Sequence, residues 1–366
     1  MKYRIITTIL MLLMVVGLIR EISEIDFRSE YKTDVYKSVY EQSQYRNGPG
    51  LIGDHIVYLY AAGSLMEGGN PLKINPEVPP LGEYMIGLSI LLFHNPNYTV
   101  VIASIITLFA LFLLGNKLYK KPMIALIPVS LFGLERVFLD QLKLPLLDII
   151  QLPFILLAFY FFFCSVTTNK KRYYLTTGLM LGFVVGIKVM ITGVLVVISW
   201  LGYLLIMRNW KSIRSLMFLT LPTAFAVLVV SYLRIFIYGV SFWYFLLVQK
   251  WVFLYQQGKI QYPFSAWSLL LFNQWQAWWG DYSILHTVDW RISWPIITLM
   301  SISFILYKLA KKEPWSKLEG MITVWIVVFS GFISLGTIST RHLLPFLPFL
   351  YLLSFKFIIM LIDKHK

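Results

Sequence analysis

Long apolar runs, joined by short connections rich in lysine and arginine, dominate this chain of 366 residues. Several of these runs exceed the roughly 18 residues that a helix needs to cross a lipid bilayer. Hydrophobic residues make up 58% of the chain and charged residues only 14%, whereas soluble domains carry about 25% charged residues. The sequence therefore predicts an all-α polytopic membrane protein.

The net charge of +14 has a topological interpretation. A soluble protein this basic would be a candidate for nucleic-acid binding, but here the basic residues lie in short loops between apolar runs, as the positive-inside rule expects. No nucleic-acid partner is therefore predicted. The single Cys164 lies in an apolar run, which excludes a disulfide framework and a cysteine metal site. The N-terminal run Ile5–Ile19 lacks a small-residue cleavage site after it, so we expect an uncleaved first span.

About ten spans place the basic loops on one side of the membrane. They are expected near residues 5–19, 97–115, 122–138, 145–165, 174–187, 189–207, 215–237, 292–309, 318–336 and 343–362. With the N-terminus in the cytoplasm, the basic loops and the C-terminal tail all face inward. This requires Leu81–Phe93, only 13 residues long, to be an interfacial helix or half-span. The alternative is eleven spans, with Leu81–Phe93 crossing and the basic pattern inverted after it.

Two large outer segments, residues 20–96 and 239–291, follow from this topology, and residues 1–366 form a single membrane domain. The outer face then gathers most of the polar residues. They are Asp54, Glu77, Asp140, Lys143, Asp148, Lys188, Tyr262–Trp267 and Arg341–His342. Ionisable residues at membrane depth are costly to hold and are therefore functional candidates.

Structural alternatives stay open for these residues. Asp54 is also suited to be a helix N-cap, and Asp148 to be an interfacial residue beside Lys143. The alternatives for Lys188 and Arg341 are a snorkelling side chain and an outer-edge anchor. Trp275, Trp278 and Trp279 form either an aromatic belt or a sugar platform.

Six short elements occur in order along the chain. They are Gly53-Asp54, the run Glu77–Gly82 (EVPPLG), Asp148 opening an apolar run, the glycine-rich Gly178–Lys188, Gln261–Trp267 (QYPFSAW) and Arg341–Pro348 (RHLLPFLP). Their order and setting resemble the protein O-mannosyltransferase/aminoarabinose transferase-like superfamily. Members of that superfamily are polyprenyl-phosphate-sugar-dependent glycosyltransferases of the C-type fold, with a membrane-associated outer loop after the first span.

The chain departs from the superfamily pattern at several positions. His55 stands where relatives often carry Glu, and Tyr262 stands where the mannosyltransferase branch has His. Val78 and Val101 replace basic residues of many relatives. We therefore expect the phosphate to be held by other cations.

The resemblance implies inverting transfer of a sugar from a polyprenyl-phosphate carrier to an acceptor hydroxyl on a protein, lipid or glycan. The reaction would occur at the extracytoplasmic face of the cell membrane. Asp54 would be the general base, and Lys188 and Arg341 would hold the donor phosphate. Asp148 would orient a cation or the sugar hydroxyls.

Three further residues are expected to contact the donor. Tyr262 and Trp267 would stack on the sugar, and Glu77 would take part in donor binding or replace Asp54 as the base. No cofactor is implied, because the sequence has neither a P-loop nor a Rossmann fingerprint. No cluster with metal-ligand spacing stands out, and the question of a divalent metal stays open.

Two other functional classes are compatible with the sequence. A transporter or flippase for lipid-linked sugars would need the apolar groove and the outer cations but no general base. A non-catalytic envelope assembly protein of the same fold would tolerate the loss of Asp54.

Overall fold

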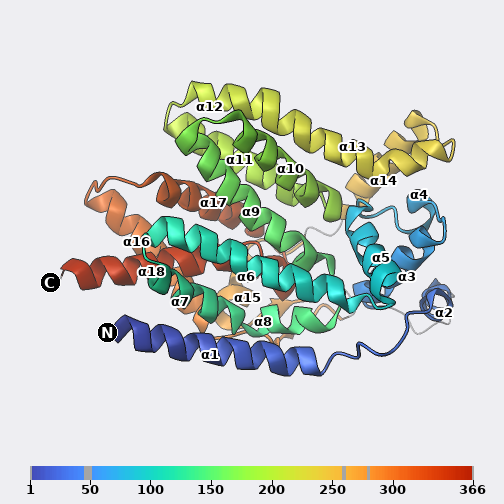
Figure 1. The fold of residues 1–366 in the computed structure, drawn as a ribbon, viewed down its shortest axis with the longest axis horizontal. Coiled ribbons are helices and arrows are strands. Elements are labelled where there is room, and N and C mark those ends of the chain that lie inside the picture. Colours follow the sequence, from blue (N-terminus) through green and yellow to red (C-terminus); the bar gives the residue numbers. More distant parts are fainter. Residues whose placement is uncertain (1, 45–51, 258–260, 278–280, 365–366) are drawn as a thin grey trace.

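The computed structural model describes residues 2–44, 52–257, 261–277 and 281–364, which form an almost entirely helical bundle (Figure 1). The longer helices are α1 (Lys2–Ser23), α6 (Asn97–Tyr119), α7 (Pro122–Gly133), α9 (Leu147–Thr168), α10 (Lys171–Ile187), α11 (Ile191–Ile206), α13 (Leu221–Ile237), α14 (Phe242–Gln257), α16 (Ser293–Ala310), α17 (Lys317–Ile333) and α18 (Leu347–Lys364). The shorter elements are α2 (Thr33–Gln44), α3 (Asp54–Met66), α4 (Pro71–Ile74), α5 (Leu81–Phe93), α8 (Arg136–Asp140), η1 (Gln141–Lys143), α12 (Trp210–Ser215), the π-helical η2 (Leu216–Thr220), α15 (Ser265–Phe272), β1 (Trp275–Gln276), β2 (Ile284–Leu285) and η3 (Thr340–Leu343). The predicted all-α polytopic membrane fold is confirmed.

Each of the ten expected spans has a helical counterpart. Within the described ranges, five helices are individually long and apolar enough to cross a membrane, or six if one bent pair counts as a span. Those five are α1, α6, α9, α16 and the continuous helix of α12, η2 and α13. Among the remaining counterparts, α10 and α17 have 17 residues each and α11 has 16.

The expectation of one continuous span over 122–138 is wrong. The helix ends at Gly133 and restarts at Arg136, with a bend of 66° between the two parts. Glu135 lies in the break with an extended backbone, and its side chain is buried. The helix breaks where this carboxylate turns into the bundle to reach donors on α16 and α18.

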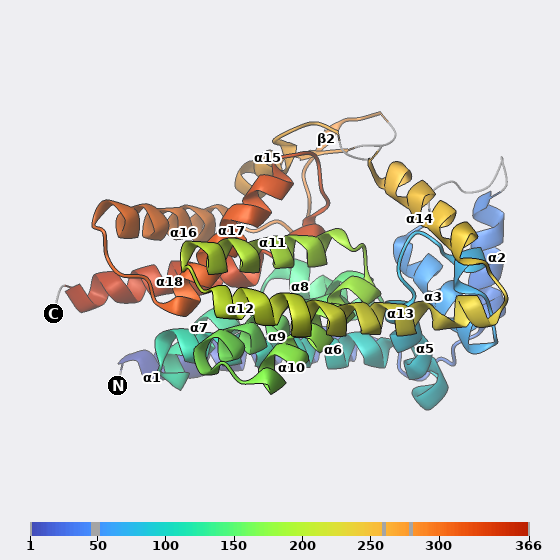
Figure 2. The same ribbon diagram turned by 90° about the horizontal axis from the view of Figure 1, so that it is seen from above.

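The segment between the first two long helices caps one end of the bundle. Helices α2 to α5 lie together at the end opposite both chain termini (Figures 1 and 2). The expected half-span Leu81–Phe93 is α5, which stays at that end beside α3 and α4. The last helix before the second polar segment, α13, is followed by α14, in which no residue is buried. Trp278 and Trp279 of the expected aromatic belt lie outside the described residues.

Small residues allow the central helices to approach closely. A Cβ on Gly178 would lie 2.5 Å from the carbonyl oxygen of Thr220, and one on Gly182 would lie 2.5 Å from the side chain of Val227. The glycine-rich run therefore lets α10 pack directly on the helix that ends in α13, as small residues do between membrane helices. On the other side of the core, the ring of Phe159 on α9 contacts Trp200 and Trp325.

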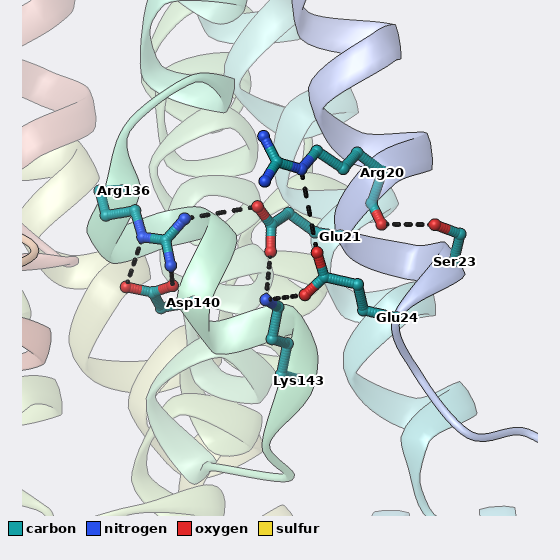
Figure 3. Close-up of polar contacts among 7 residues, drawn as sticks. All are labelled: Arg20, Glu21, Ser23, Glu24, Arg136, Asp140 and Lys143. Atoms are coloured by element: carbon teal, nitrogen blue, oxygen red, sulfur yellow. Dashed lines mark hydrogen bonds and ion pairs between the residues drawn. The ribbon is translucent and has the colours of Figure 1, made fainter.

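An ion-pair network ties α1 to the bent span (Figure 3). Lys143 contacts Glu21 at 2.6 Å, and Arg136 contacts Glu21 at 3.4 Å and Asp140 at 2.9 Å. Only 17% of the apolar window of α1 is buried, and this network adds to the packing of α1 on α7, where Met14 lies against Gly133. Lys143 therefore binds glutamates of α1, whereas Asp148 binds Lys188, so Asp148 is not explained by an interaction with Lys143.

Candidate active site

Four charged side chains from distant parts of the chain meet at the capped end of the bundle. Asp54 is the first residue of α3, and Asp148 lies in the first turn of α9. Lys188 directly follows α10, and Arg341 lies in η3. They form an alternating chain in which Asp54 contacts Arg341, Arg341 contacts Asp148 and Asp148 contacts Lys188.

The contacts within this chain differ in character. Arg341 Nη2 donates a hydrogen bond to Asp54 Oδ2, and Lys188 Nζ donates one to Asp148 Oδ1. The central link is looser, with 3.7 Å between Arg341 Nε and Asp148 Oδ2. No described residue makes a hydrogen bond to either of these two atoms. One N–H of the guanidinium is therefore not committed to a protein acceptor.

Burial of these side chains increases from Asp54 through Arg341 to the Asp148–Lys188 pair. Asp54 is 45% exposed and Arg341 is 24% exposed, whereas Lys188 is 12% and Asp148 only 5% exposed. A buried charge is stable only when it is paired, so the Asp148–Lys188 pair forms the fixed, buried end of the site. Asp54, at the open end, is the carboxylate that a ligand from outside would meet first.

The structure argues against the structural alternatives given above for Asp54, Lys188 and Arg341. Gly53, not Asp54, occupies the N-cap of α3 and makes no side-chain cap. Lys188 does not snorkel and Arg341 is not a free anchor, because both are largely buried and bound to aspartates. The expected convergence of Lys188 and Arg341 is seen, since both bind the carboxylate of Asp148.

Gly82 explains how α5 reaches this site. A Cβ at this position would lie 2.9 Å from the carbonyl oxygen of Ile187 and 2.6 Å from the side chain of Leu147. Ile187 precedes Lys188, and Leu147 precedes Asp148. The EVPPLG run therefore ends in glycine so that α5 can pack against the helix ends that carry the buried pair.

Electrostatics keeps Arg341 charged and His55 neutral. Burial opposes the charge of Arg341, but Asp148 and Asp54 outweigh this effect and raise the pKa of the guanidinium. Burial lowers the pKa of His55, and Arg341 lowers it further, against the opposing effect of Asp54. The four charges of the site sum to zero, so an incoming anion has to compete with a carboxylate for its cation.

An apolar groove of about 420 Å³ lies between α5, α10 and α13. Its lining includes Leu81 and Tyr84 of α5, Phe183 of α10, and Val227 and Val230 of α13. None of the four charged residues lines this groove, but Leu81 of its lining lies beside Gly186, where a Cβ would be 2.9 Å from the Leu81 side chain. A second hollow of about 500 Å³ lies between α2, α3 and α5 and involves none of the four charged residues.

The comparisons with known proteins agree with this picture. Residues 77–236 match the family model of dolichyl-phosphate-mannose-protein mannosyltransferases. That segment holds Glu77, Asp148 and Lys188 but neither Asp54 nor Arg341. The resemblance to the superfamily is confirmed. No curated protein matches the sequence.

Among solved structures, the chain is similar to ArnT from Cupriavidus metallidurans. The structure of ArnT bound to undecaprenyl phosphate aligns with a TM-score of 0.56 and 14% identity, over 95% of this chain and 60% of ArnT. The apo structure aligns with a TM-score of 0.53 and 14% identity, over 89% of this chain and 58% of ArnT. At this identity the match establishes the fold. The chain spans about three-fifths of the length of ArnT.

Three predicted site residues lie outside the segments that carry the four charges. Tyr262 is 39% exposed, and the indole N–H of Trp267 donates a 2.8 Å hydrogen bond to Ser334. Their segment is nevertheless tied to the strand-like stretch before Arg341, because Thr337 N donates to the carbonyl of Gln261 at 2.8 Å. Glu77 lies before α5 and is within electrostatic range of Tyr40.

The sequence analysis assigned no role to two residues near the site. Tyr58 lies one turn after Asp54 on α3, is 6% exposed, and is within electrostatic range of Asp54, Asp148 and Arg341. The i, i+4 spacing from Asp54 would have indicated it. Glu135 is 3% exposed in the broken span, and a carboxylate inside an apolar run was the signal for it. In the described ranges, no group of three His, Cys, Asp or Glu side chains is arranged to hold a metal ion.

Proposed function

We propose that this protein transfers a sugar from a polyprenyl-phosphate carrier to an acceptor hydroxyl, with inversion, at the extracytoplasmic face of the cell membrane. The observation that carries the proposal is the alternating chain Asp54–Arg341–Asp148–Lys188. An apolar groove lies between α5, α10 and α13, the helices next to it in the bundle. The mannosyltransferase family match and the ArnT-like fold support a glycosyltransferase. The undecaprenyl phosphate bound to ArnT supports a polyprenyl-linked donor.

The groove and the cations suit the two parts of such a donor. The polyprenyl chain would lie against the apolar walls formed by α5, α10 and α13. Its phosphate would reach Arg341, whose planar guanidinium suits bidentate phosphate contact, with Lys188 as a point charge behind it. These cations would stabilise the negative charge that the leaving phosphate gains in the transition state.

Donor binding would also activate Asp54. In the structure, Arg341 holds the carboxylate of Asp54, and a phosphate that attracts this guanidinium would release the carboxylate. Asp54 would then accept the proton of the acceptor hydroxyl. The acceptor oxygen forms a bond to the anomeric carbon as the bond from that carbon to the phosphate oxygen breaks on the opposite face, and polyprenyl phosphate leaves with the electron pair.

The remaining expected residues are proposed to act around the donor. Asp148 would hold Lys188 and Arg341 in place. Tyr262 and Trp267, on the segment linked to the stretch before Arg341, would contact the sugar or the acceptor. Glu77 is the alternative base. No cofactor is proposed, and the chain would act as a single membrane domain.

The test is to purify the protein, identify the lipid-linked sugar that accompanies it by mass spectrometry, and assay transfer from that donor in proteoliposomes. Transfer with inversion at the anomeric carbon is the expected result. Movement of the intact lipid-linked sugar between leaflets without transfer would establish the flippase alternative. A protein with neither activity would fit the assembly alternative and would overturn the proposal.

A further inference from the structure

Glu135 is a buried carboxylate that binds only neutral donors among the described residues. Its side chain accepts hydrogen bonds from Ser293 Oγ at 2.5 Å, from Trp294 Nε1 at 3.0 Å and from the hydroxyl of Tyr351. Glu135, Trp294 and Tyr351 are 3%, 0% and 3% exposed. The neighbouring Arg136 points elsewhere, to Glu21 and Asp140 (Figure 3).

This carboxylate joins three parts of the bundle. It lies in the break between α7 and α8, while Ser293 and Trp294 begin α16 and Tyr351 lies in the second turn of α18. Apolar packing would hold helices together at a lower desolvation cost than a buried carboxylate. Directional hydrogen bonds add what apolar packing lacks, a defined position of one helix end relative to the others.

The stretch from Arg341 to α18 is built as consecutive turns. Leu344 N donates to the carbonyl of Arg341 at 3.1 Å, and Phe346 N donates to that of Leu343 at 2.8 Å. The carbonyl of Pro345 accepts a 3.0 Å hydrogen bond from Trp325 Nε1. Leu343, Leu344 and Phe346 are at most 1% exposed. A shift at the start of α18 is therefore passed to Arg341 rather than absorbed by a loop.

We propose that Glu135 is a positioning residue, which holds α18 through Tyr351 and thereby places the guanidinium of Arg341 for the donor phosphate. This inference rests on the proposed function, in which Arg341 binds the phosphate of a polyprenyl carrier. Glu135 itself does not contact the four charges of the site. Its effect on the reaction passes through the backbone between Tyr351 and Arg341.

The chain offers a matched pair of substitutions. Tyr351→Phe removes the phenolic hydrogen bond to Glu135. Tyr119→Phe removes another buried phenolic hydrogen bond to α18, the 2.6 Å bond from Tyr119 to the carbonyl of Leu352. Both changes delete one hydroxyl at a buried tyrosine, so a merely structural role predicts similar losses of thermal stability and no difference in donor binding.

The experiment measures the Kd for undecaprenyl phosphate and the KM and kcat for a matching lipid-linked sugar, with full-length protein in detergent micelles. Tyr351→Phe is expected to raise the Kd and the KM about 10- to 100-fold, the scale of a small misplacement of a binding group, while Tyr119→Phe leaves both near the wild-type values. Ser293→Ala, a milder change at the same carboxylate, is expected to shift both in the same direction.

A double-mutant cycle provides the decisive readout. If Glu135 acts through Arg341, Tyr351→Phe adds little to the loss caused by Arg341→Gln, because coupled residues are not additive. Equal donor affinities for Tyr351→Phe and Tyr119→Phe, or additive losses in the cycle, would overturn the inference while leaving the proposed function standing. A wild-type protein that neither binds undecaprenyl phosphate nor transfers sugar would overturn both.

Discussion

Replacing Asp54 by Asn separates the base from the rest of the site. The amide has nearly the same size as the carboxylate but does not accept a proton at neutral pH. We expect the rate of sugar transfer to fall by about 10²- to 10⁴-fold, the usual contribution of a positioned general base. This corresponds to about 3–5 kcal/mol of activation free energy.

The structure also predicts that Asp54→Asn changes stability and donor affinity little. Asp54 is 45% exposed, and ion pairs at such positions contribute only about 0–1 kcal/mol. The melting temperature is therefore expected to move by no more than about 4 °C. Because the substitution removes the carboxylate that competes for Arg341, the affinity for undecaprenyl phosphate should stay equal or rise by up to about fivefold.

A matched control exists in the helix before α3. Asp34 also lies in the first turn of a helix, α2, and is exposed, so Asp34→Asn makes the same chemical change outside the site. The assay compares initial transfer rates and carrier affinities of wild type, Asp54→Asn and Asp34→Asn in proteoliposomes. Full activity of Asp54→Asn would refute its role as the base, and Glu77 would be tested next. A large loss of carrier affinity would refute the competition between Asp54 and phosphate.

Other parts of the structure lead to separate tests. Lys188→Ala should raise the activation free energy of transfer by about 2–4 kcal/mol. It should also destabilise the fold by about 3–5 kcal/mol, because the carboxylate of Asp148 stays buried without its lysine. Adding Asp148→Asn should recover thermal stability but not transfer, and recovery of both would show that Lys188 is structural. Gly82→Ala should cost about 1–3 kcal/mol of stability through overpacking against Ile187, as measured by thermal unfolding. Gly331→Ala in α17 is the control and should cost nothing, because a Cβ there meets nothing within 4 Å. The lowered pKa of His55 means that the unfolded chain binds a proton at a higher pH than the folded chain. The contribution of His55 to stability is therefore full above about pH 6.5 and is lost as the pH falls through the folded pKa. His55→Gln should flatten this dependence of the unfolding free energy on pH, and an unchanged slope would show that His55 does not cause it. In a Cys164→Ser background, a cysteine at position 288 should react with an impermeant maleimide in intact cells and one at position 170 should not, and the reverse pattern would exclude the proposed orientation.

The helical architecture follows from the apolar runs because backbone in lipid must satisfy its own hydrogen bonds. Hydropathy also indicated that Leu81–Phe93 is too short to cross; these residues form α5 at one end of the bundle, and the absence of a crossing stays a prediction. Hydropathy did not show the break at Glu135, because an average over 17 residues hides one carboxylate. That break depends on hydrogen-bond donors about 160 and 216 positions away, which no local pattern contains.

In the site too, the sequence indicated single residues but not their contacts with distant partners. Asp148, Lys188 and Arg341 were suggested by charge at the edges of apolar runs and Asp54 by its place at the start of an amphipathic stretch and in a motif, and all four meet in the structure. Their pairing was not predictable, because Asp54 and Arg341 are 287 positions apart and each had a structural explanation of its own. Tyr262 and Trp267 were chosen from a motif with a substituted first residue, and the structure places them on a neighbouring segment rather than among the charges.

The pairing of Asp54 with Arg341 gives the site an order of events. A general base that is free at all times would accept a proton from water or from any hydroxyl in reach. Here the carboxylate is held by the cation proposed to bind the donor phosphate, so the proposed base and the proposed phosphate site would be linked by competition. In the proposed reaction, Asp54 becomes available only when the sugar to be transferred is already bound, which favours transfer to the acceptor over hydrolysis of an unpositioned donor.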